Sequence, residues 1–506
     1  MDIVVGIDSS TTATKAIAWD AKGRAVAEGR ATVPMVSPHP GWFEQGVEDW
    51  WASLCAALAM LFKEVDPARV AAVAIANQRE TVGFLDENDR EIRPAILWLD
   101  LRSRPDIDYL SEKLGSGRFL AITGKTPDTT PAAFSLHWMG RCEPENWRRT
   151  ATTVDPHGYL VWRLTGERVT SWGSADPHGV MALVSKRYSP EIMAALGAVE
   201  SQFFPPVRPG THLGGVTPAA AAATGLRAGT KIIAGGGDGQ SSGLGTATLG
   251  GGRAYLNLGT AAVSGVWSWH FAADPAFRTL TSLSGEGYIY ELCLLTGSFL
   301  TDWMVSRLFG FDPKADPGVY ERLEAEATAL PIGSGGLLLL PYWQGVMSPF
   351  WNPDARGAVV GLGAGHGRAH VYRAMMEGVA LDLAMGYDAI EKVTGVPVTE
   401  LLGIGGGSRS RLWRQIVADA TGRPVRVSAT VEATCLGAGM LAAAGAGWYA
   451  TPADAAREMQ GGITDSVEPD PRRHDDYAEL LQIYKDIHPA LESTFKRLAD
   501  FRSSRM

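Results

Sequence analysis

The stretch IVVGIDSSTTATKAIA at residues 3–18 decides the fold, because it predicts an apolar strand, a short polar turn and a second apolar strand. The stretch AYLNLGTAAVSGV at residues 254–266 repeats this pattern halfway along the chain. Two hairpins with small tip residues, one opening each half, predict a duplicated domain. Such tips leave backbone N–H groups and hydroxyls free to face phosphate oxygens. We therefore expect a nucleotide between the two copies, although either hairpin alone would more often be an ordinary turn of a large sheet.

Length and composition are those of ordinary globular domains. At 506 residues the chain is too long for one hydrophobic core, so two large domains are expected. A net charge of −9, with no long basic run, argues against a nucleic-acid partner. The four cysteines lie far apart without metal-binding spacing, which is typical of a reducing cytoplasm. The weakly polar segment 435–450 is expected to be a buried helix and its turn, so no membrane contact is predicted.

Strand and helix signals alternate along the chain, which predicts an α/β architecture. Expected strands lie at residues 3–7, 15–19, 70–76, 82–85, 95–98, 231–234, 337–340 and 401–404. Expected helices lie at residues 47–64, 371–390 and 412–421. The break between domains is predicted near residues 240–254, after a glycine-rich run.

Two aspartates at predicted strand ends are candidates for phosphoryl-transfer chemistry. Asp8 ends the first strand, and Asp238 follows the run 231–234 and three glycines. A carboxylate at a strand end, beside backbone that can approach phosphate closely, can hold Mg²⁺ or accept a proton. Asp238 is also compatible with a simple turn or cap role. The segment 405–408 opens a helix after a strand, as a mononucleotide site requires, whereas the P-loop pattern is absent from the sequence.

The motifs taken together resemble the FGGY carbohydrate kinases, of the sugar-kinase, Hsp70 and actin superfamily. They occur in family order over nearly the whole chain, at residues 6–12, 77–81, 93–98, 159–166, 237–239, 257–260, 356–362, 377–380, 405–415 and 436–439. The resemblance implies two duplicated actin/Hsp70-like (ribonuclease H-like) domains with an active-site cleft between them. It also implies a sugar-binding domain at residues 1–245 and a nucleotide-binding domain at residues 246–506.

The resemblance assigns roles to individual residues of this chain. Asp238 matches the general base, and Asp8 together with Asp238 would hold Mg²⁺. Nucleotide-binding roles are implied for Thr11, Thr12, Lys15, Gly259, Thr260, Gly405, Gly406, Gly407 and Ser410. Sugar-facing roles are implied for Gln78, Arg79, Glu80, Trp98, Asp100 and Asp238. The alternatives are that Trp98 belongs to the core and that Arg79 and Glu80 form a solvated ion pair.

Departures from the family patterns bear on the substrate. Residues 77–81, Asn-Gln-Arg-Glu-Thr, have the form seen in glycerol kinases, whereas segments 93–98 and 405–415 look like the xylulose kinase branch. The aromatic residue of glycerol kinases is absent near Thr130, and Gly239 replaces their polar amide, so a larger pocket is expected.

We therefore predict an ATP-dependent kinase that phosphorylates a hydroxyl of a small sugar or polyol, with a ketopentose such as D-xylulose favoured. Its cofactors would be ATP and Mg²⁺ and its location the cytoplasm. A glycerol or erythritol kinase is one alternative, and a non-catalytic actin/Hsp70-like ATP switch is another. The oligomeric state is left open, with a homodimer as one option.

Overall fold

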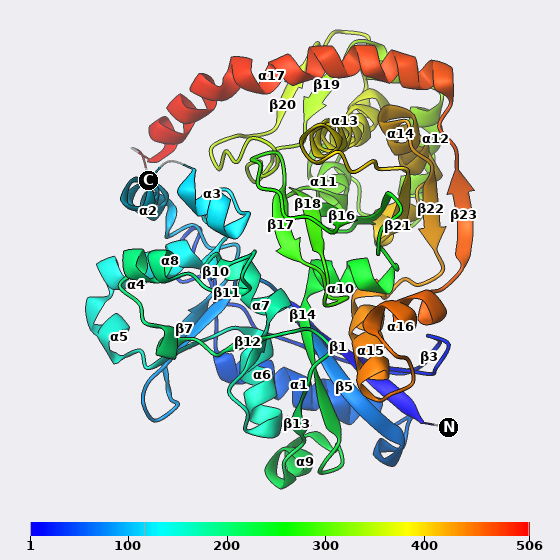
Figure 1. The fold of residues 1–506 in the computed structure, drawn as a ribbon. Helices are drawn as coiled ribbons and strands as arrows, with labels where there is room; N and C mark the ends of the chain where they lie inside the picture. The colour runs from blue at the N-terminus through cyan, green and yellow to red at the C-terminus, as the bar shows by residue number, and fades with distance from the viewer. Residues whose placement is uncertain (1, 116, 504, 506) are drawn as a thin grey trace.

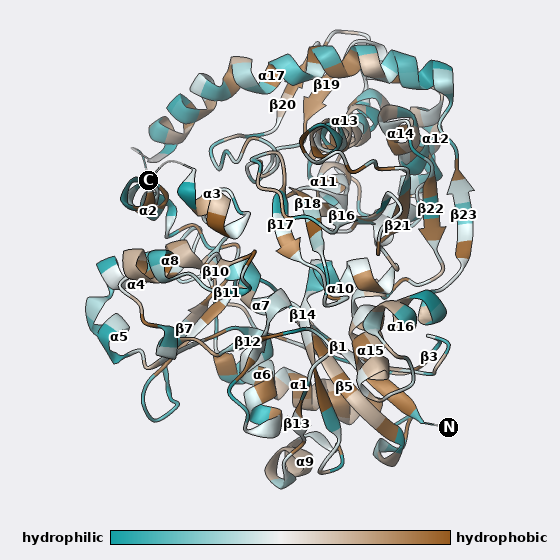
Figure 2. Ribbon diagram, viewed as in Figure 1, coloured by the Kyte–Doolittle hydropathy of each residue, from teal (hydrophilic) through white to brown (hydrophobic). Residues whose placement is uncertain are grey.

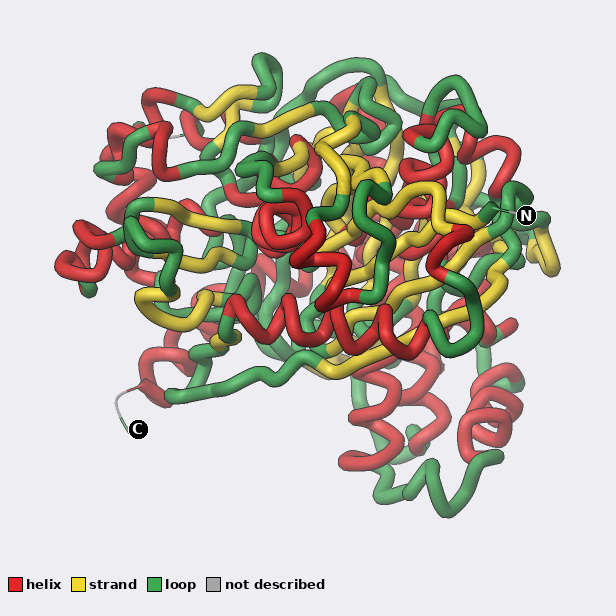
Figure 3. The backbone as a smooth tube through the Cα atoms, turned by 90° about the horizontal axis from the view of Figure 1, so that it is seen from below, coloured by secondary structure: helices red, strands yellow, loops and turns green. Residues whose placement is uncertain are grey.

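Two large mixed sheets, one in each half of the chain, organise the fold (Figure 1). The structure, a computed structural model, describes residues 2–115, 117–503 and 505, so the outer ends of the two predicted domains lie outside it. Seen from below, the strands of the sheets run through the middle of the molecule and helices lie outside them (Figure 3).

The first sheet contains the N-terminal hairpin. Its strands are β1 (Ile3–Ser9), β2 (Ala13–Trp19), β3 (Ala25–Thr32), β5 (Val70–Asn77), β13 (His212–Gly215) and β14 (Lys231–Gly237), in the order β13-β14-β5-β1-β2-β3. From β3 inward, the successive pairs are antiparallel, antiparallel, parallel, parallel and antiparallel. Strands β1, β2, β5 and β14 are largely apolar and almost entirely buried, whereas the edge strands β3 and β13 are partly exposed (Figure 2).

The second sheet repeats this series of pairings. Its strands are β15 (Arg253–Leu258), β16 (Ala262–Ser268), β17 (Arg278–Thr281), β18 (Tyr288–Leu294), β21 (Glu400–Ile404), β22 (Val425–Ser428) and β23 (Ile463–Val467), in the order β17-β18-β16-β15-β21-β22-β23. From β18 onward the pairs are again antiparallel, antiparallel, parallel, parallel and antiparallel. The duplication predicted from the two hairpins is confirmed. Strand β17 is an addition without a counterpart in the first sheet.

A smaller sheet is inserted into the first half. It has the order β4-β7-β6-β8, with β4 (Glu44–Gln45), β6 (Val82–Leu85), β7 (Glu91–Ile96) and β8 (Thr152–Val154). The predicted strand at 95–98 therefore begins earlier and ends before Trp98. Helices α2 (Arg104–Leu114), α3 (Arg118–Thr123), α4 (Ala132–Cys142), α5 (Pro144–Arg149) and α8 (Pro190–Leu196) lie in the same part of the chain. This unit has its own hydrophobic core, around Phe84, Phe134 and Met139.

The remaining elements cover the sheets or connect them. In the first half they are α1 (Val47–Leu61), α6 (Pro156–Thr165), α7 (Trp172–Ala175), α9 (Pro218–Thr224) and the short strands β9 (Thr170–Ser171), β10 (Met181–Ala182), β11 (Arg187–Tyr188) and β12 (Pro206–Val207). In the second half they are α11 (Ser298–Trp303), α12 (Val319–Thr328), β19 (Leu338–Leu340), β20 (Ala358–Val360), α13 (Arg368–Thr394), α14 (Arg411–Thr421) and α17 (Pro471–Ser503). Helix α1 forms because Trp50, Leu54 and Leu58 recur at helical spacing and are all buried.

Helices α10 (Asp238–Gly245) and α15 (Ala433–Gly445) join the two halves. The segment that includes α15 and α16 (Pro452–Met459) belongs to the second half, yet it packs on the first sheet in one core with Val4 and Ala74. Small residues permit this close approach, since a Cβ at Gly6 would lie 1.9 Å from the carbonyl oxygen of Cys435. The predicted buried helix in 435–450 is therefore found, at the junction of the halves. Within the part of the chain that the structure describes, no helix is long and apolar enough to cross a membrane.

Candidate active site

A cavity of about 420 Å³ lies where the two halves meet. Both hairpin tips reach it, through Ser10 of the first and Gly259 and Thr260 of the second. The predicted site residues that line it are Asp8, Arg79, Glu80, Trp98, Asp238, Gly259 and Thr260. The fold thus brings together residues from both halves of the chain, because the repeated hairpins place their tips at one junction.

Asp238 is held at one carboxylate oxygen and open at the other. Strand β14 ends at Gly237 and α10 begins at Asp238, so the carboxylate lies at a strand's carboxyl end. Its Oδ1 accepts hydrogen bonds from the backbone N–H of Gly239, at 2.7 Å, and from Nε of Arg79, at 2.9 Å. Oδ2 has no donor among the described residues, and the side chain is 40% exposed, toward the cavity that it lines. This geometry suits a base that accepts a proton from a bound hydroxyl.

Asp8 has the properties of a cation ligand. It lies opposite Lys15 in the first hairpin, and Lys15 Nζ in turn pairs with Glu432 Oε1 at 2.6 Å. Asp8 Oδ1 is buried without a hydrogen-bond partner among the described residues. Burial, and then the negative charge of Asp238, raise the pKa of Asp8 to about 8. A buried carboxylate beside a second carboxylate is stabilised by a bound cation, so Asp8 and Asp238 fit Mg²⁺. The described residues contain no cluster of three or more His, Cys, Asp or Glu that could hold a metal without further ligands.

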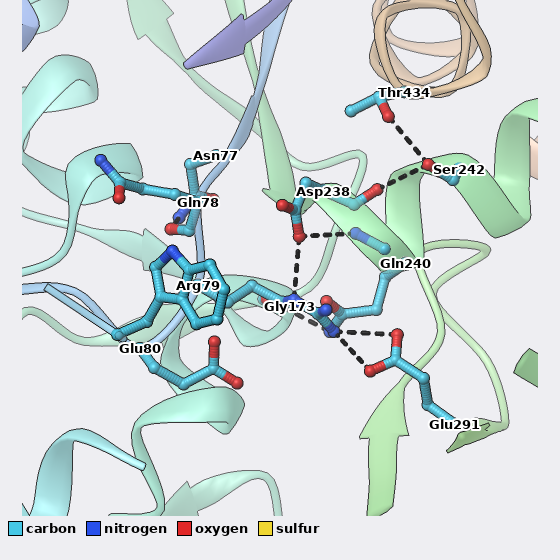
Figure 4. Close-up of polar contacts among 12 residues, drawn as sticks. Asn77, Gln78, Arg79, Glu80, Gly173, Asp238, Gln240, Ser242, Glu291 and Thr434 are labelled. Atoms are coloured by element: carbon cyan, nitrogen blue, oxygen red, sulfur yellow. Dashed lines mark hydrogen bonds and ion pairs between the residues drawn. The ribbon is translucent and has the colours of Figure 1, made fainter. Parts of the chain in front are cut away.

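Arg79 and Glu80 are tied to the second half of the chain. Figure 4 shows Arg79 between Asp238 and Glu291, and its Nη1 donates to both carboxylate oxygens of Glu291 at 3.0 Å. Glu80 accepts a hydrogen bond from Nη1 of Arg278 at 2.8 Å. The backbone of Glu80 is left-handed, with φ of 61°, which is an uncommon conformation for a residue with a side chain. Arg79 and Glu80 are thus buried residues that line the cavity, so the alternative of a solvated surface ion pair is wrong.

Sequence reasoning missed three polar side chains here, namely Tyr255, Arg278 and Glu291. Arg278 lies in β17 and Glu291 in the otherwise apolar strand β18, and Nε of Arg278 donates to Glu291 Oε2 at 2.6 Å. The hydroxyl of Tyr255 donates to Glu291 Oε1 at 2.7 Å. The available signal was the lone acid within the apolar run YIYELCL, since an unpaired buried charge is costly and needs a partner.

Two predicted substrate residues do not line the cavity. Gln78 is buried and donates through Nε2 to Gln45 at 2.9 Å. Asp100 accepts hydrogen bonds from the backbone of Phe43, at 2.6 Å, and from the guanidinium of Arg102. Their polar groups position neighbouring segments of the first half.

Trp98 links the segment after β7 to the tip of the first hairpin. Its indole N–H donates to Thr11 Oγ1 at 2.9 Å, while the carbonyl oxygen of Thr11 accepts from Gln45. Trp98 is therefore a cavity residue, not a core residue.

Glu291 and Arg79 occupy the space where a side chain of residue 239 would begin. A Cβ at Gly239 would lie 2.6 Å from Glu291 Oε1 and 3.0 Å from Nη2 of Arg79. Gly239 itself lines the cavity, as expected, but Glu291 and Arg79 fill the space on the side where its side chain would begin, so that space is not open to a substrate. Thr130, where an aromatic residue is absent, does line the cavity.

The turn at residues 405–410, for which nucleotide-binding roles are predicted, lies against the second hairpin. Gly405 has φ of 81°, and a Cβ there would lie 2.4 Å from Asn257 Oδ1. Gly406 faces open space, since a Cβ there would meet nothing within 4 Å, whereas Gly407 packs on Leu258. Ser410 caps α14 by accepting from the backbone of Trp413 at 3.1 Å. This turn and the exposed tip residue Thr12 lie outside the 420 Å³ cavity.

Comparison with known proteins agrees with this arrangement. The model of the FGGY family of carbohydrate kinases, N-terminal domain, matches residues 3–245, and that of the C-terminal domain matches residues 254–446. A xylulose kinase of Bacillus subtilis is 29% identical over the whole of both chains, and one of Streptomyces rubiginosus is 31% identical over 97% of each. The crystal structure of xylulose kinase from Rhodospirillum rubrum, 29% identical, superimposes with a TM-score of 0.89 over 98% of this chain and 100% of that one. The predicted family and the predicted actin/Hsp70-like two-domain fold are confirmed.

Proposed function

Because the chain belongs to the FGGY family of carbohydrate kinases, we propose that it transfers the γ-phosphoryl group of ATP to a hydroxyl of a small neutral sugar, with D-xylulose as the first candidate. The geometry of Asp238 carries this proposal. Its Oδ1 is fixed by two donors, whereas its Oδ2 has no donor among the described residues, and the side chain lines the same cavity as the tips of both hairpins. The similarity to proteins named xylulose kinase supports the choice of sugar.

The proposed reaction uses positioning more than covalent chemistry. The oxygen of the sugar hydroxyl forms a bond to the γ-phosphorus while Asp238 accepts the hydroxyl proton. ADP leaves with the electrons of the broken P–O bond. Backbone N–H groups of the hairpin tips, near Thr11 and Thr260, would face the phosphates. Mg²⁺ would supply charge neutralisation there, and Asp8 and Asp238 are the residues that would hold it.

The two halves would divide the substrates between them. In this proposal residues 1–245 bind the sugar and residues 246–506 bind most of the nucleotide, through Gly259, Thr260 and the turn at 405–410. The first hairpin, at residues 11–15, would contribute only at the phosphates. The contact of both halves with the cavity supports exclusion of water, which would otherwise compete with the sugar as acceptor.

The charges around the cavity favour a neutral sugar over a sugar acid. Its described lining residues include two cations, Arg79 and Arg278, and each is already bonded to carboxylates. A substrate carboxylate would have to displace one of these partners and would also face Asp8 and Asp238. A neutral ketose avoids both costs.

Two other functions remain to be tested against this one. Thr130 in place of an aromatic residue favours a five-carbon substrate over glycerol or erythritol, since less of the cavity is filled. A non-catalytic ATP switch would need no sugar-facing cluster, whereas Arg79, Glu80 and Trp98 line the cavity.

The four free cysteines agree with a reducing compartment such as the cytoplasm.

The test is a coupled ADP-release assay over D-xylulose, D-ribulose, xylitol, arabitol, glycerol, erythritol and gluconate, with Mg²⁺ present. We expect ADP release to depend on added sugar and kcat/KM to be highest for a ketopentose. Release that is slow and insensitive to every sugar would contradict the proposed function and favour the switch.

A further inference from the structure

Sugar recognition in the first half is built on charges that the second half supplies. Arg79 and Glu80, which follow β5, each bond to a residue of the opposite half. Arg79 donates to Glu291 at 3.0 Å, and Arg278 donates to Glu80 at 2.8 Å. Arg278 also donates to Glu291 at 2.6 Å, which joins the two pairs. We call Arg79, Glu80, Arg278 and Glu291 the crossed-pair network.

The crossed-pair network is buried and electrically balanced. The side chains of Arg79, Glu80 and Arg278 are at most 8% exposed and Glu291 is fully buried. Burial alone would raise the pKa of Glu291, but Arg278 and Arg79 outweigh it and lower the pKa to about 2. Removing Arg278 would leave Glu80 buried without its ion pair and would take one of two cations from Glu291, and proteins tolerate such a loss poorly. The four side chains are therefore expected to hold one arrangement together.

Two features of the backbone accommodate this arrangement. The absent side chain of Gly239 leaves the space that Glu291 and Arg79 fill. Glu80 keeps a left-handed backbone, with φ of 61°, and in this conformation its carboxylate meets Arg278. Strand β17, which carries Arg278, is also the strand that the first sheet lacks. The added strand thus delivers a cation to the sugar-facing loop of the other half.

We propose that Arg278 is a positioning residue for the sugar, which fixes Glu80 directly and Arg79 through Glu291, so that sugar binding requires the second half to be in place. This inference rests on the proposed function and adds to it a residue outside the motifs of the first half. Because coupling between sites is reciprocal, sugar binding would favour the arrangement in which the nucleotide loops approach the acceptor hydroxyl.

The decisive variants are Arg278→Gln, Arg278→Lys and Glu80→Gln, with the double variant Arg278→Gln/Glu80→Gln. Arg278→Gln should raise KM for the preferred sugar about tenfold or more and change the Kd of ATP less than about twofold. Arg278→Lys should recover part of this loss, because an ammonium keeps the charge but not the fork that reaches two carboxylates. The double variant should raise KM no more than about twofold beyond the worse single variant, because each change removes the same Arg278–Glu80 interaction.

Lys125→Met is the matched control. Lys125 is equally buried and also joins the halves, with Nζ 3.0 Å from Asp176 Oδ1 and 2.9 Å from the carbonyl oxygen of Thr279, but it does not line the cavity. We expect Lys125→Met to lower the melting temperature while leaving KM for sugar within about twofold of wild type.

Several outcomes would overturn the inference. One is an unchanged KM in Arg278→Gln, and another is the same rise in KM in Lys125→Met, which would assign the effect to general packing of the halves. Should Arg278→Gln fail to fold, Arg278→Lys decides, and a wild-type KM in that variant counts against the proposal. If the wild-type protein turns over no sugar, the proposed function itself is wrong. If the wild type is active and the Arg278 variants keep its KM for sugar, only this inference is wrong.

Discussion

Nε of Arg79 lies 2.9 Å from Oδ1 of Asp238, so a single ion pair joins the loop after β5 to the carboxylate at the end of β14. The backbone N–H of Gly239 bonds to the same oxygen. The two donors fix the carboxylate plane and leave the second oxygen to face the cavity. Arg79 therefore does two things at once, because it orients Asp238 and also carries the charge that Glu291 compensates.

Replacing Asp238 by Asn should abolish most of the chemistry without unfolding the protein. The amide oxygen can still accept from Arg79 and Gly239, but the side chain can no longer take a proton. Loss of a general base costs about 10²- to 10⁴-fold in rate, and kcat should fall within that range. Sugar-dependent ADP formation measures kcat, and calorimetry should show that ATP still binds. A kcat within a few-fold of wild type would remove Asp238 from the role of base.

Replacing Glu80 by Ala should weaken sugar binding selectively. The change removes a carboxylate that lines the cavity and leaves Arg278 with one partner fewer. We expect KM for sugar to rise about tenfold or more, the loss of one or two hydroxyl contacts, with KM for ATP nearly unchanged. Equal effects on both substrates would show that Glu80 serves folding or closure of the halves.

The sequence was sufficient for the local features of this site. The hairpins at 3–18 and 254–266 could be predicted because strand alternation and small tip residues are encoded in neighbouring positions. Asp238 could be predicted because it follows an apolar run at a glycine-rich turn. Features of this kind depend on residues a few positions apart.

Contacts between the two halves could not be predicted from the sequence. Arg278 and Glu291 lie in short strands without a motif, and their partners Glu80 and Arg79 are far away along the chain. Gln78 shows the converse error, because its motif was recognised while its side chain is engaged by Gln45, away from the cavity. Which polar group of a motif faces the substrate depends on packing that no local pattern records.

A five-carbon ketose should be a better substrate than glycerol. Thr130 leaves part of the cavity unfilled, and each unmade contact is worth about 1 kcal/mol or more. We therefore expect kcat/KM for the preferred pentulose to exceed that for glycerol by at least about tenfold. Initial rates over a range of each sugar, at saturating ATP, give the comparison. If glycerol is turned over as well as every pentose, the glycerol kinase alternative is restored.

The stability of the first half should depend on pH through His157. This histidine of α6 is fully buried, and its Nε2 accepts a hydrogen bond from the backbone N–H of Gly235, in the strand that ends beside Asp238, at 3.0 Å. Burial lowers the pKa of His157 to about 4, against a weaker opposing effect of Asp155. A protonated imidazole could not accept this hydrogen bond, so the folded state resists protonation.

The sign of the effect follows from these two pKa values. Between pH 4 and the ordinary histidine pKa of about 6.5, the unfolded chain binds more protons than the folded one, so stability falls as pH falls. The contribution of His157 is complete above about pH 6.5, and a shift of this size corresponds to a loss of about 3 kcal/mol by pH 4. Urea unfolding of wild type and His157→Gln from pH 8 to pH 4.5 measures the difference, since glutamine can accept the same hydrogen bond without titrating. We expect the wild-type free energy of unfolding to fall by about 2 kcal/mol more than that of the variant, and His212→Gln, at an exposed position, to follow the wild-type curve. Parallel curves for wild type and His157→Gln would show that this histidine does not contribute to the pH dependence of the free energy of unfolding.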